Sequence, residues 1–291
     1  MASEQLGFIG LGTMGGRMCR NLATKSGRPV IGFDMDAKRI EALSAAGVTG
    51  ATSVADVVQK ADIIFMCLPG ENQVREVGLG AGGLTENCRS GQTVVDMTTA
   101  TVSIARELAE ALQAKGVDFI DAPIARGVPS AEDGTLSIMV GGATSVYERV
   151  HSLLACMGTD IAHCGDIGAG QVVKLMNNMM VFQTVSALSE AMAIGTRAGV
   201  DGAKLFEVLA NGSADSFVLR RHGAHMPTGN YPDDQFPTTY SLKDLRYALG
   251  LAEDVGVDAK GAKVVEERFV EAIEKGYGHL YSPVIYKLFE Q

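Results

Sequence analysis

A glycine-rich turn near the start of the chain constrains the fold more than any other feature. Gly10-Leu-Gly12-Thr-Met-Gly15 directly follows the apolar run from Leu6 to Ile9 and precedes a helical pattern. G-x-G-x-x-G between a strand and a helix is typical of a dinucleotide-binding βαβ unit. The first glycine permits the tight turn, the second lets backbone approach a pyrophosphate, and the third lets helix and strand pack closely. We therefore predict phosphate binding at this helix N-terminus.

The next strand indicates which dinucleotide binds. The run from Pro29 to Phe33 ends at Asp34, and an acidic residue at this place accepts the ribose hydroxyls of NAD. It would repel the 2′-phosphate of NADP, and Met35 and Asp36 bring no arginine. NAD is therefore the predicted cofactor, with the alternative that Asp34 only caps the next helix. The cofactor contacts predicted in these turns are Gly10, Leu11, Gly12, Thr13, Met14, Gly15, Asp34 and Met35.

Strand and helix patterns continue to alternate up to residue 164. This alternation predicts an α/β fold, a Rossmann-type doubly wound sheet with mostly parallel strands. Ligands of such sheets lie at the carboxyl ends of the strands. There the chain places the predicted cofactor contacts Leu68, Pro69, Gln73 and Thr98, although the Thr98 and Thr99 hydroxyls could equally cap the next helix. The further strands are predicted at 62–68, 92–96, 117–121, 136–140 and 160–164, with helices at 53–60, 102–115 and 145–156.

Beyond Gly165 strand patterns almost vanish. A chain of 291 residues suits two domains. We predict an NAD-binding Rossmann domain over 1–164 and an all-helical substrate and oligomerisation domain over 165–291, which begins with a long central helix. Further helices are predicted at 202–210, 214–221, 242–254, 261–275 and 283–289.

The central helix, within 167–200, is apolar on nearly all sides and carries a polar cluster near its start. A helix apolar all round is buried in protein or lipid. Charged residues inside this one exclude lipid, because an interior charge is costly there. Lys174 and Asn178 are spaced i,i+4 and share a face, with Asn177 beside them. Either this is a functional cluster, or Lys174 reaches to the surface and the asparagines are satisfied locally.

Composition and residue spacing narrow the classes of protein to which this chain can belong. A net charge of −9 disfavours nucleic acid as a partner. The first residues lack the pattern of a secretory signal, and no other segment approaches a membrane span. Five scattered cysteines without CxxC spacing predict a reduced, cytoplasmic protein, and the five histidines show no metal-ligand spacing.

Several motifs stand together in one order. They are Gly7-Phe-Ile-Gly-Leu-Gly-Thr-Met-Gly15, Asp121-Ala-Pro-Ile, Gly134-Thr-Leu, Val140-Gly-Gly, Gly168-Ala-Gly-Gln-Val-Val-Lys174-Leu-Met-Asn-Asn178 and Lys243-Asp244-Leu245. Over essentially the whole chain they resemble the β-hydroxyacid dehydrogenase family, which includes 3-hydroxyisobutyrate dehydrogenases and tartronate semialdehyde reductases. The resemblance implies a cleft between two domains, with nicotinamide against the start of the central helix.

The resemblance also implies roles for single residues. Lys174 matches the catalytic lysine and Asn178 the asparagine that orients substrate. Lys243 matches a lysine that closes over the cofactor, and Thr98 a position near the nicotinamide ribose. A lysine in a partly dehydrated cleft can exchange the hydroxyl proton, because burial favours the neutral amine. The implied substrate contacts are Ala125, Arg126, Gly127, Lys174, Asn177 and Asn178.

The substrate loop departs from the family pattern. Where the family reads Asp-Ala-Pro-Val-Ser-Gly-Gly, this chain has Ala125 in place of the serine and Arg126 in place of the next glycine. Arginine binds anions through paired N–H donors, and members acting on sulfolactaldehyde carry an arginine in this loop. We hypothesise a sulfonate or second carboxylate on the substrate. The alternative is that Arg126 faces solvent or pairs with Glu132 or Asp133.

The predicted activity is NAD-dependent oxidation of a small β-hydroxyacid to its semialdehyde, with a sulfolactaldehyde reductase as the second candidate. Two other classes share the pattern, a non-catalytic NAD(P)-binding module that has lost the lysine and an imine reductase with Asp or Tyr in its place. Lys174 argues against both. The long apolar helix in an acidic chain predicts a homodimer or homotetramer.

Overall fold

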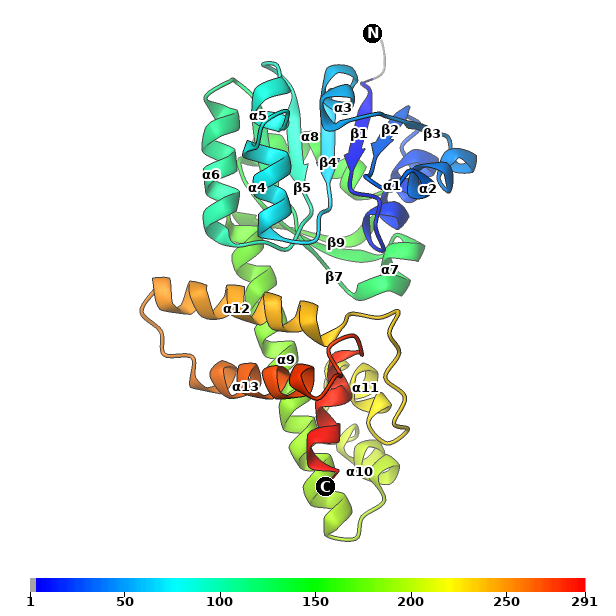
Figure 1. Ribbon diagram of the computed structural model, residues 1–291, viewed down its shortest axis with the longest axis vertical. Coiled ribbons are helices and arrows are strands. Elements are labelled where there is room, and N and C mark those ends of the chain that lie inside the picture. The colour runs from blue at the N-terminus through cyan, green and yellow to red at the C-terminus, as the bar shows by residue number, and fades with distance from the viewer. Residues whose placement is uncertain (1–3, 291) are drawn as a thin grey trace. The chain divides into compact units, whose positions relative to one another are not determined.

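The computed structural model describes residues 4–290 and divides the chain into two compact units, Met1–Lys174 and Leu175–Gln291. The first contains the sheet and the second is helical (Figure 1). Among the described residues, no helix has the length and apolar character needed to cross a membrane.

The first unit contains a nine-stranded, mostly parallel sheet, which confirms the predicted fold class. The strands lie in the order β3-β2-β1-β4-β5-β6-β8-β7, and β9 pairs with β8. Strands β1 to β6 are parallel, whereas β8 runs antiparallel to β6 and β7. The strands are β1 (Leu6–Ile9), β2 (Val30–Phe33), β3 (Val48–Gly50), β4 (Ile63–Met66), β5 (Thr93–Asp96), β6 (Asp118–Asp121), β7 (Ile124–Ala125), β8 (Leu136–Gly141) and β9 (Gly158–Gly165).

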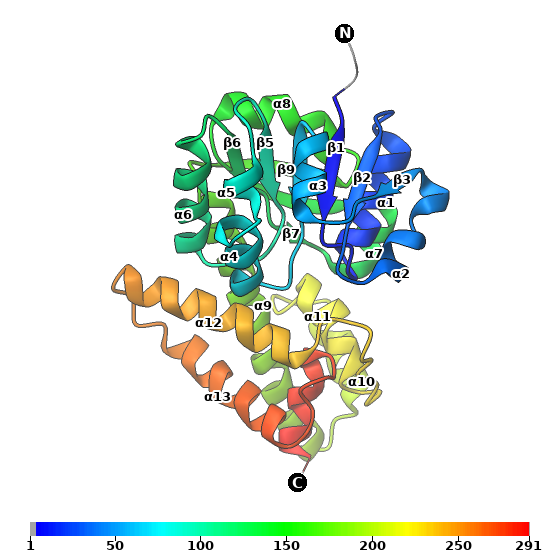
Figure 2. The same cartoon turned by 45° about the horizontal axis from the view of Figure 1, so that its top comes forward.

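Helices cover both faces of this sheet, because alternate strand residues point to opposite faces. Phe8 and Phe65 pack in one cluster with α1, α7 and α8, while Ile9 and Ile64 pack in the other with α3, α4, α5 and α6. Figure 2 shows α3 and α8 on opposite sides of the strands. The helices are α1 (Gly15–Lys25), α2 (Ala37–Glu41), α3 (Val54–Lys60), α4 (Glu71–Leu79), α5 (Leu84–Asn87), α6 (Val102–Gln113), α7 (Gly127–Asp133) and α8 (Thr144–Leu154).

The second unit is all-helical, as predicted, with some different boundaries. The helix expected from Ala214 begins at Phe217, because the Ser216 side chain caps it by accepting the Leu219 N–H at 3.0 Å. The last predicted helix is a 3₁₀ helix, Ser282–Phe289. The α-helices are α9 (Ala169–Arg197), α10 (Gly202–Leu209), α11 (Phe217–Arg221), α12 (Thr238–Asp254) and α13 (Lys260–Glu274).

The central helix is α9, and within a single chain it is not buried on all sides. Val173, Met180, Ala187 and Ile194 form an exposed stripe, with Met180 and Ile194 exposed by 67% and 69%. These positions repeat every seven residues, close to two helical turns. The buried contacts come instead from other faces of the helix, where Phe182 packs in the core of the second unit.

Candidate active site

The glycine turn is built so that two of its glycines cannot carry a side chain. Gly10 has φ +88°, and a Cβ there would lie 2.3 Å from the Cys67 carbonyl oxygen. A Cβ on Gly15 would lie 2.0 Å from the Gly10 carbonyl oxygen. At Gly12 a Cβ would meet only the Arg39 guanidinium, at 3.3 Å. The backbone is therefore open at Gly12, the position that must approach a pyrophosphate.

Asp34 ties the end of β2 to this turn. One carboxylate oxygen accepts the Leu11 N–H at 2.7 Å, and the other accepts the Asp36 N–H at 2.9 Å. Arg39, on α2, reaches the same carboxylate at 3.5 Å. Arg39 was not predicted at this site, because it lies five residues beyond Asp34 and only the helical turn of α2 brings it back. Met35, the next residue, is 95% exposed.

The ends of β4 and β5 are joined through Thr98. Its hydroxyl accepts the Leu68 N–H at 3.0 Å, its own N–H donates to Asp96 at 2.9 Å, and its side chain is fully buried. Thr98 therefore holds two strand ends together at the edge where the cofactor is predicted. Pro69 is exposed beside it, and Gln73 lies in the first turn of α4.

Lys174 lies in the second turn of α9 and is only 8% exposed. Two residues without a predicted role anchor the start of this helix. Asp121, at the end of β6, accepts the N–H groups of Gly168 at 2.7 Å and Gln171 at 2.8 Å. The Gln171 side chain donates to the Thr98 carbonyl at 2.7 Å and accepts the Ala100 N–H at 3.1 Å. Both residues stand in the quoted motifs, but their partners are far away in the sequence.

One turn beyond Lys174, a hydrogen-bonded chain orients Asn178. Its amide oxygen accepts from Asn177 at 3.0 Å, and its amide nitrogen donates to Asp244 at 2.7 Å. Asp244 is buried and also pairs with Lys243 at 2.8 Å. The Lys243 ammonium lies 4.9 Å from the centre of the Tyr247 ring, a cation–π contact. Asp244 thus connects two predicted site residues, although the sequence offered it no role.

Arg126, in the substrate loop, is exposed, as one of its alternatives had it, but it pairs with a different residue from those expected. Its guanidinium donates to Asp160 at 2.6 Å, to Thr159 at 3.3 Å and to the Thr135 carbonyl at 3.2 Å. Pairing with Glu132 or Asp133 is therefore wrong, because the side chain turns toward β9. Ala125 pairs with β8, and Gly127 begins α7.

Glu132 instead pairs with two arginines of α1, Arg17 and Arg20.

Arg126 is the only non-glycine residue among 4–290 with a positive φ, +87°. That backbone suits glycine, the residue that the family pattern has at this position.

Two buried carboxyl groups lie side by side at the ends of β5 and β6, where Asp96 and Asp121 are paired in register. Burial raises the pKa of Asp96 to about 7, against hydrogen bonds from Thr98 that lower it. Burial also raises the pKa of Asp121 to about 6, although backbone N–H groups of α9 favour its charged form. Asp96 is therefore the more readily protonated of the two.

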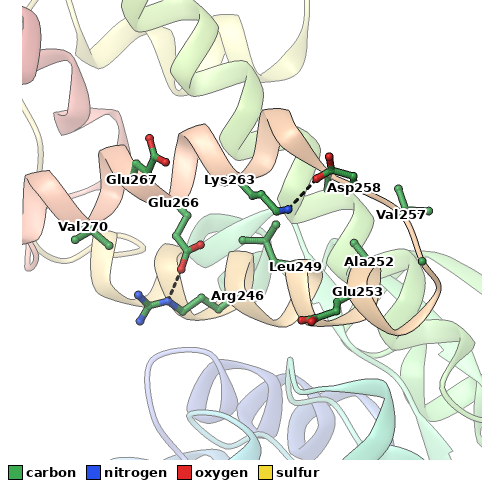
Figure 3. A pocket seen from close by; sticks show the side chains of 13 residues that line it. Arg246, Leu249, Ala252, Glu253, Val257, Asp258, Lys263, Glu266, Glu267 and Val270 are labelled. Carbon is green, nitrogen blue, oxygen red and sulfur yellow. Dashed lines mark hydrogen bonds and ion pairs between the residues drawn. The ribbon is translucent and has the colours of Figure 1, made fainter.

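A hollow of about 980 Å³ lies between α12 and α13 in the second unit (Figure 3). Arg246 pairs with Glu266 across it at 2.7 Å, and Lys263 pairs with Asp258 at 2.8 Å. Its thirteen lining residues, all within the described range, include none of the predicted site residues.

Comparison with known proteins assigns the family. Residues 5–165 match the family model for the NAD-binding domain of 6-phosphogluconate dehydrogenase, and residues 168–288 match the model for the NAD-binding region of NADP-dependent 3-hydroxyisobutyrate dehydrogenase. A 2-(hydroxymethyl)glutarate dehydrogenase from Eubacterium barkeri is 32% identical over 290 residues, 99% of this chain and 96% of its own. The chain belongs to the β-hydroxyacid dehydrogenase family. It is a nicotinamide-dependent dehydrogenase that acts on CH–OH groups.

Further comparisons agree with this assignment. Mitochondrial 3-hydroxyisobutyrate dehydrogenase from Rattus norvegicus is 36% identical over 267 residues, 89% of this chain and 78% of its own. A Mycobacterium tuberculosis 3-hydroxyisobutyrate dehydrogenase solved with L-serine superposes with a TM-score of 0.90 at 26% identity, covering 99% of both chains. An imine reductase from Pseudomonas sp. reaches a TM-score of 0.63 at 18% identity, which shows a shared fold alone.

Proposed function

We propose that this dehydrogenase oxidises a small 3-hydroxyacid to its semialdehyde, with Lys174 as the group that exchanges the hydroxyl proton. The observation that carries this proposal is the burial of Lys174 one turn before Asn178, on a helix whose start is anchored to the cofactor-binding edge of the sheet. The names of the relatives support the substrate class.

When bound, nicotinamide would accept the hydride from the carbon that carries the hydroxyl. The Lys174 amine takes the hydroxyl proton as the carbonyl forms, and in the reverse direction its ammonium returns that proton to the oxygen. Asn178 orients the substrate, since Asn177 and Asp244 fix its amide in one direction. Asn177, Ala125 and Gly127 are proposed as further substrate contacts.

We propose NAD as the preferred cofactor, because an acidic residue at the end of the second strand, here Asp34, would accept the ribose hydroxyls and repel a 2′-phosphate. Arg39 moderates this preference, since its guanidinium lies near the same carboxylate and near Gly12. The proposed contacts are Gly10, Leu11, Gly12, Thr13, Met14, Gly15, Asp34, Met35, Leu68, Pro69, Gln73, Thr98 and Lys243. A Rossmann domain over 1–164 and a substrate and oligomerisation domain over 165–291 complete the proposal.

A second anionic group on the substrate would have to compete with the ion pair that Arg126 already makes with Asp160. The hydrogen bonds to Asp160, Thr159 and the Thr135 carbonyl all come from Nη1, and Asp160 offsets the charge of the guanidinium, so a sulfonate-specific activity is not favoured. A dicarboxylate deserves the same test, since one relative is named for 2-(hydroxymethyl)glutarate. Arg126→Ala should raise the KM of any substrate that it binds, and an unchanged KM across all active substrates would exclude the role.

The exposed stripe of α9 supports a homo-oligomer, because apolar side chains repeated along one helix face favour helix packing. Met180 and Ile194 are its most exposed members. Met180→Glu with Ile194→Glu should lower the mass measured by sedimentation if copies pack through this stripe. We also propose a reducing, cytoplasmic location, because the sequence has five scattered cysteines without CxxC spacing.

The activity is tested by following reduced nicotinamide absorbance with NAD or NADP over a panel of acids. The panel contains 3-hydroxyisobutyrate, 2-(hydroxymethyl)glutarate, glycerate, serine, threonate and sulfolactate. Lys174→Ala should lower kcat by roughly 10²- to 10⁴-fold, while the exposed-lysine control Lys204→Ala should leave it unchanged. Equal activity of Lys174→Ala and wild type would refute the role of Lys174.

A further inference from the structure

The start of α9 is capped by a residue from another element. The Asp121 carboxylate accepts the N–H groups of Gly168 and Gln171, at 2.7 and 2.8 Å. These groups lie at the helix N-terminus, where no intrahelical acceptor exists. A negative charge there also interacts favourably with the helix dipole. A side chain of β6 therefore accepts the hydrogen bonds that the side chain of a local N-cap residue normally accepts.

The backbone around this cap leaves no space for a side chain at two glycines. A Cβ on Gly170 would lie 2.4 Å from the Met139 carbonyl oxygen and 2.8 Å from an Asp121 carboxylate oxygen. A Cβ on Gly141 would lie 2.5 Å from the other carboxylate oxygen of Asp121 and 2.9 Å from the Ala169 nitrogen. The first turn of α9 thus lies directly against β6 and β8, and only glycine fits at both contacts.

Gln171 provides a third attachment, to the end of β5. It is fully buried and bonds through both ends of its amide, to the Thr98 carbonyl and the Ala100 N–H. Thr98 also holds Leu68 at the cofactor edge. The helix start is therefore fixed to the same strand ends that carry predicted cofactor contacts.

We propose that Asp121 is a positioning residue that fixes Lys174 by anchoring the first turn of α9. Lys174 follows Gln171 by three residues, less than one helical turn, so its backbone moves with the anchored turn. A misplacement of about 1 Å can cost a catalytic site roughly 10²-fold in rate. This inference rests on the proposed function, because it assigns a consequence to the position of Lys174.

The first test is Asp121→Asn, which keeps the shape but replaces one acceptor with an amide donor. That donor would face a backbone N–H, so one of the two bonds to α9 is lost. We expect kcat to fall by roughly 10- to 100-fold, with the Kd of the cofactor unchanged. Asp118→Asn is the matched control, because Asp118 lies on the same strand and is exposed. A fall in cofactor affinity with unchanged kcat would overturn the proposal.

A double-mutant cycle separates positioning from general structural damage. If Asp121 acts through Lys174, adding Asp121→Asn to Lys174→Ala should leave the residual rate unchanged. A purely structural role would lower the rate by the same factor in both backgrounds, and that result would contradict the inference. If Asp121→Asn does not fold, Gln171→Met should show the same non-additivity, since it removes the third attachment and keeps the cap.

Hydrogen exchange tests the anchor without any activity measurement. Amides of residues 169–175 should exchange faster in Asp121→Asn than in wild type, and at the wild-type rate in Asp118→Asn. Unchanged exchange would show that Asp121 does not anchor the helix. If wild type oxidises no acid of the panel, the proposed function fails, while the exchange result still decides the anchoring.

Discussion

Two strand-end turns of the first unit share nearly the same positive φ, but one has glycine at that position and the other has arginine. Gly10 has φ +88° and Arg126 has φ +87°. A side chain at Gly10 is excluded, because its Cβ would lie 2.3 Å from a carbonyl oxygen. Arg126 carries a long side chain whose hydrogen bonds to Asp160, Thr159 and Thr135 offset the backbone strain.

This difference explains which turn the sequence could predict. Where nearby backbone leaves space only for glycine, as at Gly10, glycine must stand at that position, and the motif can be recognised in the sequence. Strain offset by a partner far along the chain leaves no such motif, because Asp160 lies 34 positions from Arg126. The following predictions test this contrast, in order of decreasing effect.

Gly10→Ala should have the largest effect. The added Cβ would clash with the Cys67 carbonyl in a backbone region unfavourable to alanine, with a loss of roughly 3 kcal/mol or more of unfolding free energy. Gly12→Ala is the matched control, since it meets only the flexible Arg39 side chain. It should fold normally and bind the cofactor more weakly. Urea unfolding and cofactor titration distinguish the two, and equal stability losses would contradict the steric argument.

Asp96→Asn tests the buried carboxyl group at the end of β5. The folded-state pKa of Asp96 is raised from 3.8 to about 7, so the folded protein binds the proton more tightly than the unfolded chain. Stability therefore falls as pH rises from about 4 to about 7 and stays reduced above that range.

The Asn variant should lose less unfolding free energy over this range, by on the order of 3 kcal/mol. Urea unfolding at several pH values measures the difference. The remaining fall belongs to Asp121, whose raised pKa of about 6 has the same sign. Parallel pH curves for variant and wild type would show that Asp96 ionises freely in the folded protein.

Asp34→Asn asks whether a charge beside the glycine turn sets cofactor choice. The variant removes the repulsion of a 2′-phosphate and leaves Asp36 as the carboxylate that pairs with Arg39. The ratio of NAD to NADP affinity should shift toward NADP by roughly tenfold, about 1.4 kcal/mol. Arg39→Ala should shift it the opposite way, and both ratios follow from fluorescence titrations. No shift in either variant would remove Asp34 from the proposed specificity site.

Arg126→Gly should have the smallest effect on stability. Glycine relieves the backbone strain, while the variant loses an exposed ion pair and gains flexibility when unfolded, so the net change should stay within about 1 kcal/mol. Arg126→Ala keeps the strain and loses the ion pair. It should therefore be less stable than Arg126→Gly in urea unfolding, by roughly 1 kcal/mol. The reverse order would mean that the left-handed backbone is not strained here.

Much of the fold was predictable from local pattern. Strand patterns marked seven of the nine strands, and the two that were missed, Val48–Gly50 and Ile124–Ala125, are too short to show a pattern. Helices α4 and α5 were also missed, as was α7, which starts at Gly127 directly after the strained Arg126. The exposed stripe of α9 was misjudged, because a helix apolar on nearly all sides does not reveal which side the core covers.

The sequence by itself determined the Rossmann topology, the glycine turn with Asp34 and the placement of Lys174 and Asn178 on one helix. These features depend on short-range rules, namely backbone sterics, strand and helix periodicity and i,i+4 spacing. Tertiary structure alone decided that Asp121 caps α9, that Asp244 connects Asn178 with Lys243, and that Arg126 pairs with Asp160. Hydrogen bonds and ion pairs join whichever residues folding brings together, so their partners carry no fixed spacing along the chain.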